Sequence, residues 1–393
     1  MNILWVSPFL PKADAPHAGG RALASWIAGT AERHAVTLLC RIEPAEQADA
    51  EAWRPRLAGL HLQAFARPSG LLATARIAAS YARLGREANR LLAAGRFDLV
   101  HVEYLETGLA LDGRLPVPKL AVAIDELTRP AGHRLRLARG APARLGAWLY
   151  WRGIGRLQRR ICRKFDRILT MSEHDRRALL AGDPGLSIGV LPLPTGLDPA
   201  RLTGTRGAAG LLFVGAMNRD ANIDAVMYFH REILPPVRSE VPAATVTIVG
   251  GDPAPEVRRL ADERGVQVTG FVDALEPFYA AATVFVAPLR IAGGIAGKTL
   301  DALAAGCAVV TTTIGNDGIG ATPGAHLLVA DTPAEFAAAV VRLLRDPALR
   351  ERLGAAARAF AEVRHAPKVS ADTLEREHAT LASATALTRQ SAS

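Results

Sequence analysis

Residues 284–313 constrain the fold more than any other part of the chain. The apolar run Val284–Ala287 stops at a proline, which is typical of a buried parallel strand. Two glycines follow, and a Leu- and Ala-rich helix is expected over 297–305, with Gly306 at the position that ends helices. The β-branched run 307–313 predicts the next strand. The segment therefore predicts a strand, a glycine loop, a helix and a strand of a parallel α/β sheet.

Two charged residues stand at the start of this helix. The unpaired N–H groups of a helix start favour an anion, and Lys298 adds a positive charge in the first turn, where the helix dipole does not favour a cation. A phosphate bound there would explain that placement. Asp301 lies three residues on, on the same face, where it can accept hydrogen bonds from a vicinal diol such as a ribose. Equally compatible with the spacing alone is a solvated Lys298 with Asp301 as its ordinary partner.

The stretch P-L-R-I-A-G-G-I-A-G-K-T-L-D-A-L-A-A-G-C-A-V-V-T-T resembles the donor-site segment of the GT-B glycosyltransferases of family GT4. The most similar branch carries a Gly-Gly...Lys...Leu-Asp/Glu-Ala motif. The resemblance implies that Lys298 holds the donor diphosphate and that Asp301, in place of a glutamate, binds the ribose. It also places the loop along the donor, and the loop residues concerned are Gly293, Gly294, Ile295 and Ala296. The first of the family's two glutamates falls on Gly293, so this chain lacks that carboxylate.

The same resemblance assigns residues elsewhere in the chain. Gly19 and Gly20 match a glycine loop that closes over the donor diphosphate, and Val272 lies where relatives hold the base through backbone groups. Relatives have an arginine directly after the glycine of the second domain's first strand, where this chain has Ala216. Arg219, in the longer loop, is expected to supply that charge.

Asp125 is the remaining catalytic candidate. The strand expected over 119–124 delivers Asp125 and Glu126 to a loop at its carboxyl end, a favourable place for chemistry in a parallel sheet. Many relatives have a histidine in this loop, and none follows directly here. The alternative is that one of the two carboxylates caps the next helix or pairs with Arg129.

Strands alternate with helices in both halves of the chain, which indicates parallel, Rossmann-like sheets. With the resemblance, the fold expected is α/β of GT-B type, two Rossmann-like domains facing across a cleft. The N-terminal, acceptor-side domain is expected over 1–197, followed by a linker over 198–210. The nucleotide-sugar-binding domain is expected over 211–365, a terminal helix crossing back over 366–381, and a disordered tail over 382–393.

Composition limits the class of protein further. The chain has 393 residues, of which 49% are hydrophobic and 22% charged, enough for two globular domains with full cores. The three cysteines are far apart in apolar contexts and indicate buried thiols in a reducing compartment. No basic leader and no apolar run of membrane-spanning length is visible. The expected location is cytoplasmic, with peripheral contact at the inner face of the cell membrane.

Positive charge is concentrated between Arg129 and Arg167. This segment holds eleven arginines and one lysine against Asp166, a net +11, whereas the whole chain carries +9. Apolar residues recur at helical spacing over 145–165, and a helix there is expected to bury Leu149 and Leu157 among others. Three interpretations remain: a solvated helix face, a surface for an anionic membrane or lipid-linked acceptor, and a nucleic-acid site, which is the least favoured.

The resemblance implies a retaining hexosyltransferase that moves a sugar from a UDP- or GDP-type nucleotide sugar to a glycan or lipid-linked acceptor. Synthesis of a cell-surface polysaccharide or glycolipid is the expected setting. No DxD motif or His/Cys cluster is visible, so no metal and no other cofactor is expected. Two alternatives stand: an inactive GT-B homologue that only binds, which the missing carboxylate at Gly293 would suit, and a nucleic-acid-binding or -modifying protein.

Overall fold

The computed structural model describes residues 1–13, 15, 18–66, 68, 72–124, 127–128, 131–132, 135, 138, 140–204, 207, 209–291 and 294–391, with the backbone alone for 18 and 384–391. The chain divides into two compact units. Unit 1 comprises Met1–Ala15, Gly19–Pro192 and the segment from Ser370 onward, and unit 2 contains Leu193–Val369.

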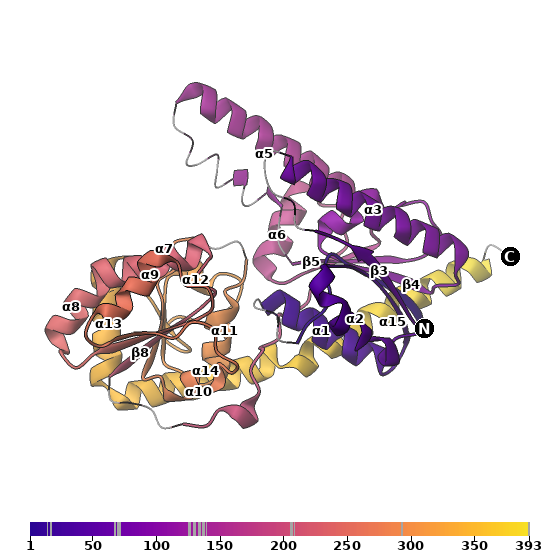
Figure 1. The fold of residues 1–393 in the computed structure, drawn as a ribbon. Coiled ribbons are helices and arrows are strands. Elements are labelled where there is room, and N and C mark those ends of the chain that lie inside the picture. Colours follow the sequence, from indigo (N-terminus) through magenta and orange to yellow (C-terminus); the bar gives the residue numbers. More distant parts are fainter. Residues whose placement is uncertain are drawn as a thin grey trace. The chain divides into compact units, whose positions relative to one another are not determined.

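Unit 1 is built on a parallel sheet that has seven strands in its described part, in the order β3-β2-β1-β4-β5-β6-β7. The strands are β1 (Asn2–Ser7), β2 (Ala35–Ile42), β3 (Gly59–Ala64), β4 (Leu99–Glu103), β5 (Lys119–Ala123), β6 (Arg167–Thr170) and β7 (Ile188–Val190). The helices are α1 (Ala18–Ala31), α2 (Gln47–Glu51), α3 (Ala73–Ala94), α5 (Ala141–Cys162), α6 (Glu173–Gly182) and α15 (Pro367–Ser391). Figure 1 shows α3 and α5 on one face of this sheet and α1 and α15 on the other.

Unit 2 repeats the design. Its described residues form a six-stranded parallel sheet in the order β10-β9-β8-β11-β12-β13. The strands are β8 (Gly210–Val214), β9 (Thr245–Val249), β10 (Val266–Val268), β11 (Val284–Ala287), β12 (Val309–Thr311) and β13 (Leu328–Val329). The helices are α7 (Asp220–Tyr228), α8 (Leu234–Glu240), α9 (Pro255–Arg258), α10 (Glu276–Ala281), α11 (Gly297–Ala304), α12 (Thr313–Asn316), α13 (Pro333–Arg345) and α14 (Pro347–His365). The two sheets confirm the predicted α/β class with two Rossmann-like domains.

The central strands of both sheets are buried on two faces, which explains why these strands are mostly apolar. In β11 every residue is buried, and β1 is buried from Ile3 to Ser7. The unit 1 core also takes up helix residues such as Leu84 and Ile161. Each strand order changes direction once, between β1 and β4 in unit 1 and between β8 and β11 in unit 2. Such switch points are where open α/β sheets bind ligands, beyond the carboxyl ends of the strands.

The last helix of the chain belongs to unit 1 from Ser370 onward. Trp26 Nε1 donates to Ser370 Oγ at 3.0 Å, and Arg167 makes a bidentate pair with Glu377 at 2.7 and 2.8 Å. His378 meets buried His101 at 2.8 Å.

The division between the units falls after Pro192, five residues before the predicted boundary. Helix α15 runs to Ser391, over the predicted terminal helix and most of the predicted tail, and the disorder of that tail stays a prediction.

Helix α5 differs from the prediction in what it buries. Only its last two turns contribute buried residues, among them Ile161, whereas Leu149 is 57% and Leu157 is 37% exposed. The expectation that the helix buries Leu149 and Leu157 is therefore wrong. The physical reason is visible in Figure 1, where the first turns of α5 extend beyond the other elements of unit 1 and meet no sheet to pack against. Across the described residues, no helix is long and apolar enough to cross a membrane.

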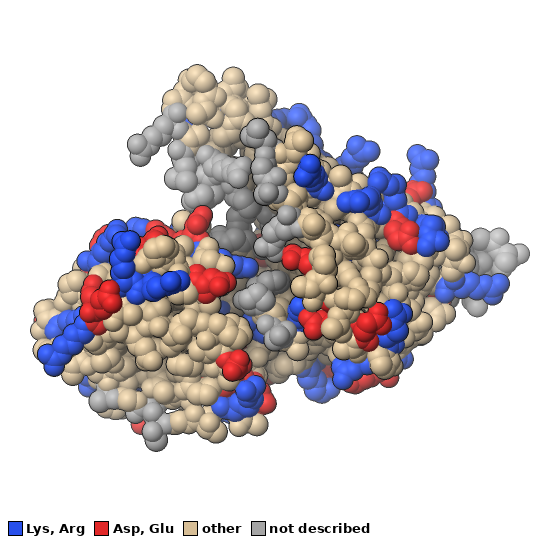
Figure 2. All heavy atoms as spheres, in the orientation of Figure 1, with Lys and Arg blue, Asp and Glu red and all other residues tan. Residues whose placement is uncertain are grey.

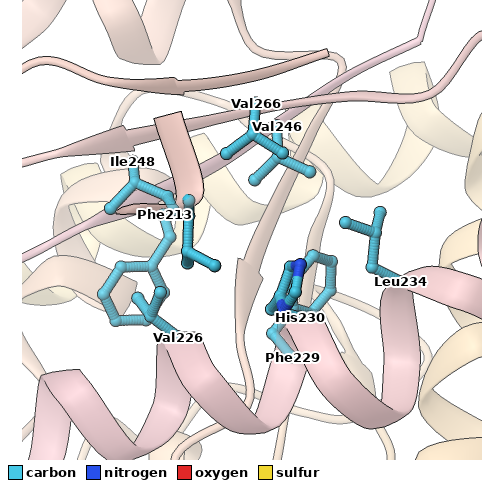
Figure 3. A pocket seen from close by; sticks show the side chains of 9 residues that line it. Phe213, Val226, Phe229, His230, Leu234, Val246, Ile248 and Val266 are labelled. Carbon is cyan, nitrogen blue, oxygen red and sulfur yellow. The ribbon is translucent and has the colours of Figure 1, made fainter. Parts of the chain in front are cut away.

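Unit 2 contains a small apolar cavity between its sheet and the chain around α7 and α8 (Figure 3). It measures about 10 Å³ and is lined by apolar side chains including Phe213, Val226 and Ile248. A π-helical turn, Phe229–Ile233, places Phe229 and His230 at its edge. A volume of this size holds at most one water molecule. The cavity is a packing defect of the core and not a site for a ligand.

Candidate functional site

The candidate site lies at the switch point of unit 2. The loop 215–219 leaves the carboxyl end of β8 and leads into α7, and the loop 288–296 leaves the neighbouring end of β11 and leads into α11. The two helix starts therefore lie beside each other at one edge of the sheet. The sequence predicted the second of these loops as the centre of the site and assigned Arg219 of the first loop to it, and the sheet order places the two loops side by side.

Lys298 turns toward the β8 loop. Its Nζ donates a hydrogen bond to Asn222 Oδ1 and lies 4.5 Å from the centre of the Phe213 ring. Burial, and secondarily the positive charge of Arg219, lowers the pKa of Lys298 to about 7. A lysine that is only partly charged at neutral pH is prepared to gain a proton when an anion binds.

Asn222 and Gly215 fix the position of this lysine. The Asn222 side chain donates through Nδ2 to Ala216 O at 2.8 Å while its Oδ1 accepts from Lys298, so both ends of the amide are used. A Cβ on Gly215 would lie 2.8 Å from Lys298 Nζ and 2.7 Å from Asn222 Nδ2, closer than real contacts allow. Sequence reasoning missed Asn222 as a functional residue. The available signal was an asparagine in the first turn of a helix, where its propensity is poor.

Arg219 precedes α7 and is exposed. Asn222, which accepts from Lys298 Nζ, donates through its backbone N to Arg219 O at 2.9 Å, so Lys298 and Arg219 lie on either side of one residue. The charge of Arg219 also contributes to the lowered pKa of Lys298. The structure therefore brings together two of the predicted residues, Lys298 and Arg219. Repulsion between them is relieved when a dianion or trianion lies between, which is the electrostatic requirement of a diphosphate site.

The ends of β8 and β9 approach each other closely at the same edge. Gly250, which follows β9, has φ of +153°, and a Cβ there would lie 1.8 Å from Gly215 O. Gly250 N donates to Gly270 O at 3.1 Å, and Met217 N donates to Gly251 O at 2.9 Å. These backbone contacts join the β8, β9 and β10 loops into one continuous rim.

The predicted base-binding residue, Val272, lies on this rim after β10. It is partly buried, and the preceding Phe271 is 78% exposed, an unusual exposure for a phenylalanine. A Cβ on Gly251 would lie 3.6 Å from Phe271 Cβ, so the ring stands beside the β9 loop. Sequence reasoning missed Phe271, whose flat apolar surface is suited to stack on a nucleobase.

Asp301 is buried, with 3% of its surface exposed. Its Oδ1 accepts from Thr195 Oγ1 at 3.1 Å and from Gly196 N at 3.0 Å, within unit 2. The carboxylate thus anchors the first residues of unit 2 to α11. Its predicted role toward a ribose stays a prediction.

The other predicted residues fall into three groups. Gly294, Ile295 and Ala296 lead directly into α11, where Ala296 O accepts from Thr299 N at 2.8 Å and Ile295 O accepts from Gly297 N at 2.9 Å. Gly19 and Gly20 lie in the first turn of α1, so they are helical and not part of a preceding loop. Gly293 and Asp125 lie outside the described residues.

Replacing Asp301 separates an anchoring role from a ligand role. Asp301→Ala leaves two donors without their acceptor, and we expect unit 2 to lose about 1–3 kcal/mol in free energy of unfolding. Asp301→Asn keeps an oxygen at Oδ1 and should lose less free energy of unfolding. If Asp301 also accepts from a ribose, both variants bind a nucleoside diphosphate more weakly than wild type and bind pyrophosphate as wild type does. Equal losses for the two ligands in calorimetry would contradict the ribose contact.

Comparison with known families decides the class of this unit. Residues 208–346 match the family described as Glycosyl transferases group 1. Over these residues unit 2 is similar to a glycosyltransferase domain. The matched range includes β8, α7, β11 and α11, and hence Lys298, Arg219 and Asn222. No curated protein matches the sequence.

Solved structures extend the likeness in fold over the whole chain. Sucrose-phosphate synthase from Thermosynechococcus elongatus is 18% identical, with a TM-score of 0.75, over 98% of this chain and 100% of that one. Anabaena HepE in complex with UDP is 12% identical, with a TM-score of 0.68, over 97% and 100%. The N-terminal domain of Candida albicans trehalose-6-phosphate phosphatase is 11% identical, with a TM-score of 0.69, over 97% of each chain. The fold of both units is thus of GT-B type.

Proposed function

We propose that this protein transfers a sugar from a nucleoside diphosphate sugar to an acceptor hydroxyl, as a member of the GT4 branch, with retention of the anomeric configuration. The observation that carries the proposal is the placement of Lys298 and Arg219 around Asn222 at the switch point of unit 2, beside the start of α11. HepE has been solved with UDP and with UDP-glucose, which supports a UDP-type donor for a chain of this fold.

The chemistry asked of these residues is stabilisation of a leaving group. As transfer proceeds, the bond between the sugar C1 and the diphosphate oxygen breaks and the acceptor oxygen bonds to C1. The acceptor proton passes to the departing diphosphate. Lys298, Arg219 and the N–H groups at the start of α11 face the charge that grows on the diphosphate, which is where preorganised cations and dipoles lower a barrier most. On the other side of the rim, Phe271 and Val272 would receive the base.

The proposed transfer needs no metal ion, because the two cations take the charge that a divalent ion would otherwise neutralise. The test is hydrolysis and transfer measured with UDP-glucose, GDP-mannose and ADP-glucose, each with EDTA and with Mg²⁺. Turnover of one donor, undiminished by EDTA, is the expected result. Binding without turnover of any of them would indicate a homologue that only binds, and activity restored solely by Mg²⁺ would contradict the metal-free mechanism.

A lipid-linked or glycolipid acceptor at an anionic membrane fits the charge of unit 1. The segment 129–167 carries a net +11. Each basic side chain near an anionic surface contributes about 1 kcal/mol, and salt screens the sum. We expect liposomes with anionic lipid to float the protein at low salt and neutral liposomes to leave it behind. Equal recovery with both would favour an acceptor free in solution.

A further inference from the structure

A pocket of about 470 Å³ lies between α5 and α6 of unit 1, far along the sequence from the donor site. Three arginines of α5 line it, Arg152, Arg156 and Arg159, and buried Cys162 and Leu179 contribute apolar surface. The volume falls in the range of small-molecule sites. A cavity with cations along one wall and apolar atoms along another is suited to a ligand with a phosphate and a hydrocarbon part.

The arginines face one way because of their spacing. Arg152, Arg156 and Arg159 are four and three residues apart, so they follow one face of the helix. Gly155 lies among them and leaves the space open, since a Cβ there would reach only ordinary contact, 3.8 Å from Arg159 Nη1 and from Thr128 Cγ2. The face of α5 that lines the pocket is therefore a cationic wall, and Gly155 leaves an open space at its centre.

The charge of this wall is only partly offset by acids in the described ranges, where the carboxylate of Asp183 acts on Arg159 without forming an ion pair with it. No aspartate or glutamate in the described ranges forms an ion pair with Arg152, Arg156 or Arg159. The nearby carboxylate of Asp183 pairs with a different arginine, Arg163, at 2.7 Å. Converging arginines with free donor groups are the usual means of holding a phosphate, often through two hydrogen bonds each.

The turns of α5 that precede the pocket indicate which chemical group a bound phosphate would carry. Leu145 is 58% exposed, Trp148 41%, Leu149 57% and Tyr150 49%, so large apolar and aromatic side chains cover the free end of the helix. In Figure 2 the visible face of that end is free of charged residues, and arginine and lysine side chains begin farther along. Exposed apolar surface beside a phosphate site suits a hydrocarbon chain and does not suit a free phosphate or a nucleic-acid backbone.

We propose that the α5–α6 pocket binds the phosphate group of an anionic lipid, whose hydrocarbon chain lies along the exposed apolar turns of α5. The aromatic residues then sit at the level of the lipid headgroups, where tryptophan and tyrosine are enriched at membranes. This is a site for one lipid molecule with a defined place, in addition to the diffuse attraction of a basic surface. It does not depend on the sugar donor or on turnover.

The test uses short-chain dioctanoyl phosphatidic acid, which is soluble enough for calorimetry, with the full-length protein. We expect saturable binding of one lipid per chain. The double variant Arg156→Gln/Arg159→Gln should weaken it by at least about tenfold, because two charge-assisted contacts are lost. The matched control, Arg144→Gln/Arg160→Gln, removes the same charge from the same helix outside the pocket and should stay within about twofold. Gly155→Met fills the gap without changing charge and should also abolish binding.

Further ligands test whether the bound phosphate must belong to a lipid. Dioctanoylglycerol lacks the phosphate and inorganic phosphate lacks the chains, and both should bind at least about tenfold more weakly than the lipid. Inorganic phosphate binding as tightly as the lipid would overturn the proposal, and so would displacement of the lipid by an equal concentration of a single-stranded oligonucleotide. Equal loss of lipid binding in the pocket variant and in the Arg144/Arg160 control would show that only net charge matters, and would also overturn it.

Discussion

Lys298→Met is expected to weaken binding of a nucleoside diphosphate by about 1.5–3 kcal/mol, roughly 10- to 150-fold, and at the same time to raise the melting temperature of the ligand-free protein. The first effect follows from loss of the charge that meets the diphosphate. The second follows from the lowered pKa of this lysine, which means that folding buries its ammonium group at a cost. Methionine keeps the length of the side chain and its contact with Phe213 without that cost.

The pH dependence of both effects has a definite sign. The folded-state pKa of Lys298, about 7, lies below the ordinary lysine value of 10.5. The unfolded chain therefore binds more protons between pH 7 and 10.5, and the lysine's penalty is complete below pH 7 and fades as pH rises through that window. Lys298→Met should gain most in melting temperature at or below pH 7, by about 2–6 °C.

Binding of the diphosphate reverses the preference of the folded protein for a neutral Lys298. The negative ligand raises the pKa of Lys298, so the complex takes up a proton above pH 7 and wild-type affinity falls as pH rises beyond that value. Calorimetry in buffers of different ionisation enthalpy measures the proton directly. The Lys298→Met variant should take up fewer protons on binding. The Arg231→Met variant, which removes an exposed cation of the same unit, should behave as wild type. A wild-type affinity that stays flat from pH 7 to 9 would show that the lysine does not contact the phosphates.

Gly250→Ala is expected to lower the free energy of unfolding of unit 2 by at least about 3 kcal/mol, the largest stability effect predicted for a single methyl group in this chain. Its φ of +153° belongs to a region that other residues rarely adopt, and the new Cβ would lie 1.8 Å from Gly215 O. The obstructing atom is backbone, so no side chain can move aside. The β8 and β9 loops would have to separate.

Gly270→Ala, in the loop after the neighbouring strand β10, provides the matched control. Its φ is +73°, and a Cβ there would have nothing within 4 Å. It should cost only about 1–2 kcal/mol, the cost of a left-handed conformation alone. Chemical denaturation of the two variants measures the difference. Equal losses would mean that the close approach of Gly250 to Gly215 contributes nothing, and the rim would then be less tightly joined than the contacts indicate.

The sequence by itself determined the α/β class, because apolar strands and amphipathic helices repeat at a spacing that only a parallel sheet satisfies. It also made Lys298 a candidate for binding an anion, since a cation in the first turn of a helix is not favoured by the helix dipole; that role stays a prediction. Local chemistry of this kind can be read from neighbouring residues. The roles of Asn222, Gly250 and Phe271 could not be found in this way, because the residues they contact lie in loops and helices that only the fold brings near.

Only the tertiary structure decided which loops meet. The strand order places β8 beside β11, and this brings Asn222 and Arg219 to Lys298 across 76 and 79 positions of sequence. It also decided what α5 buries: helical spacing predicted a packed face, but the helix is longer than the sheet beneath it, so its first turns keep their leucines and tryptophans exposed. Periodicity specifies the face of a helix, whereas the extent of the neighbouring layer decides how much of that face is covered.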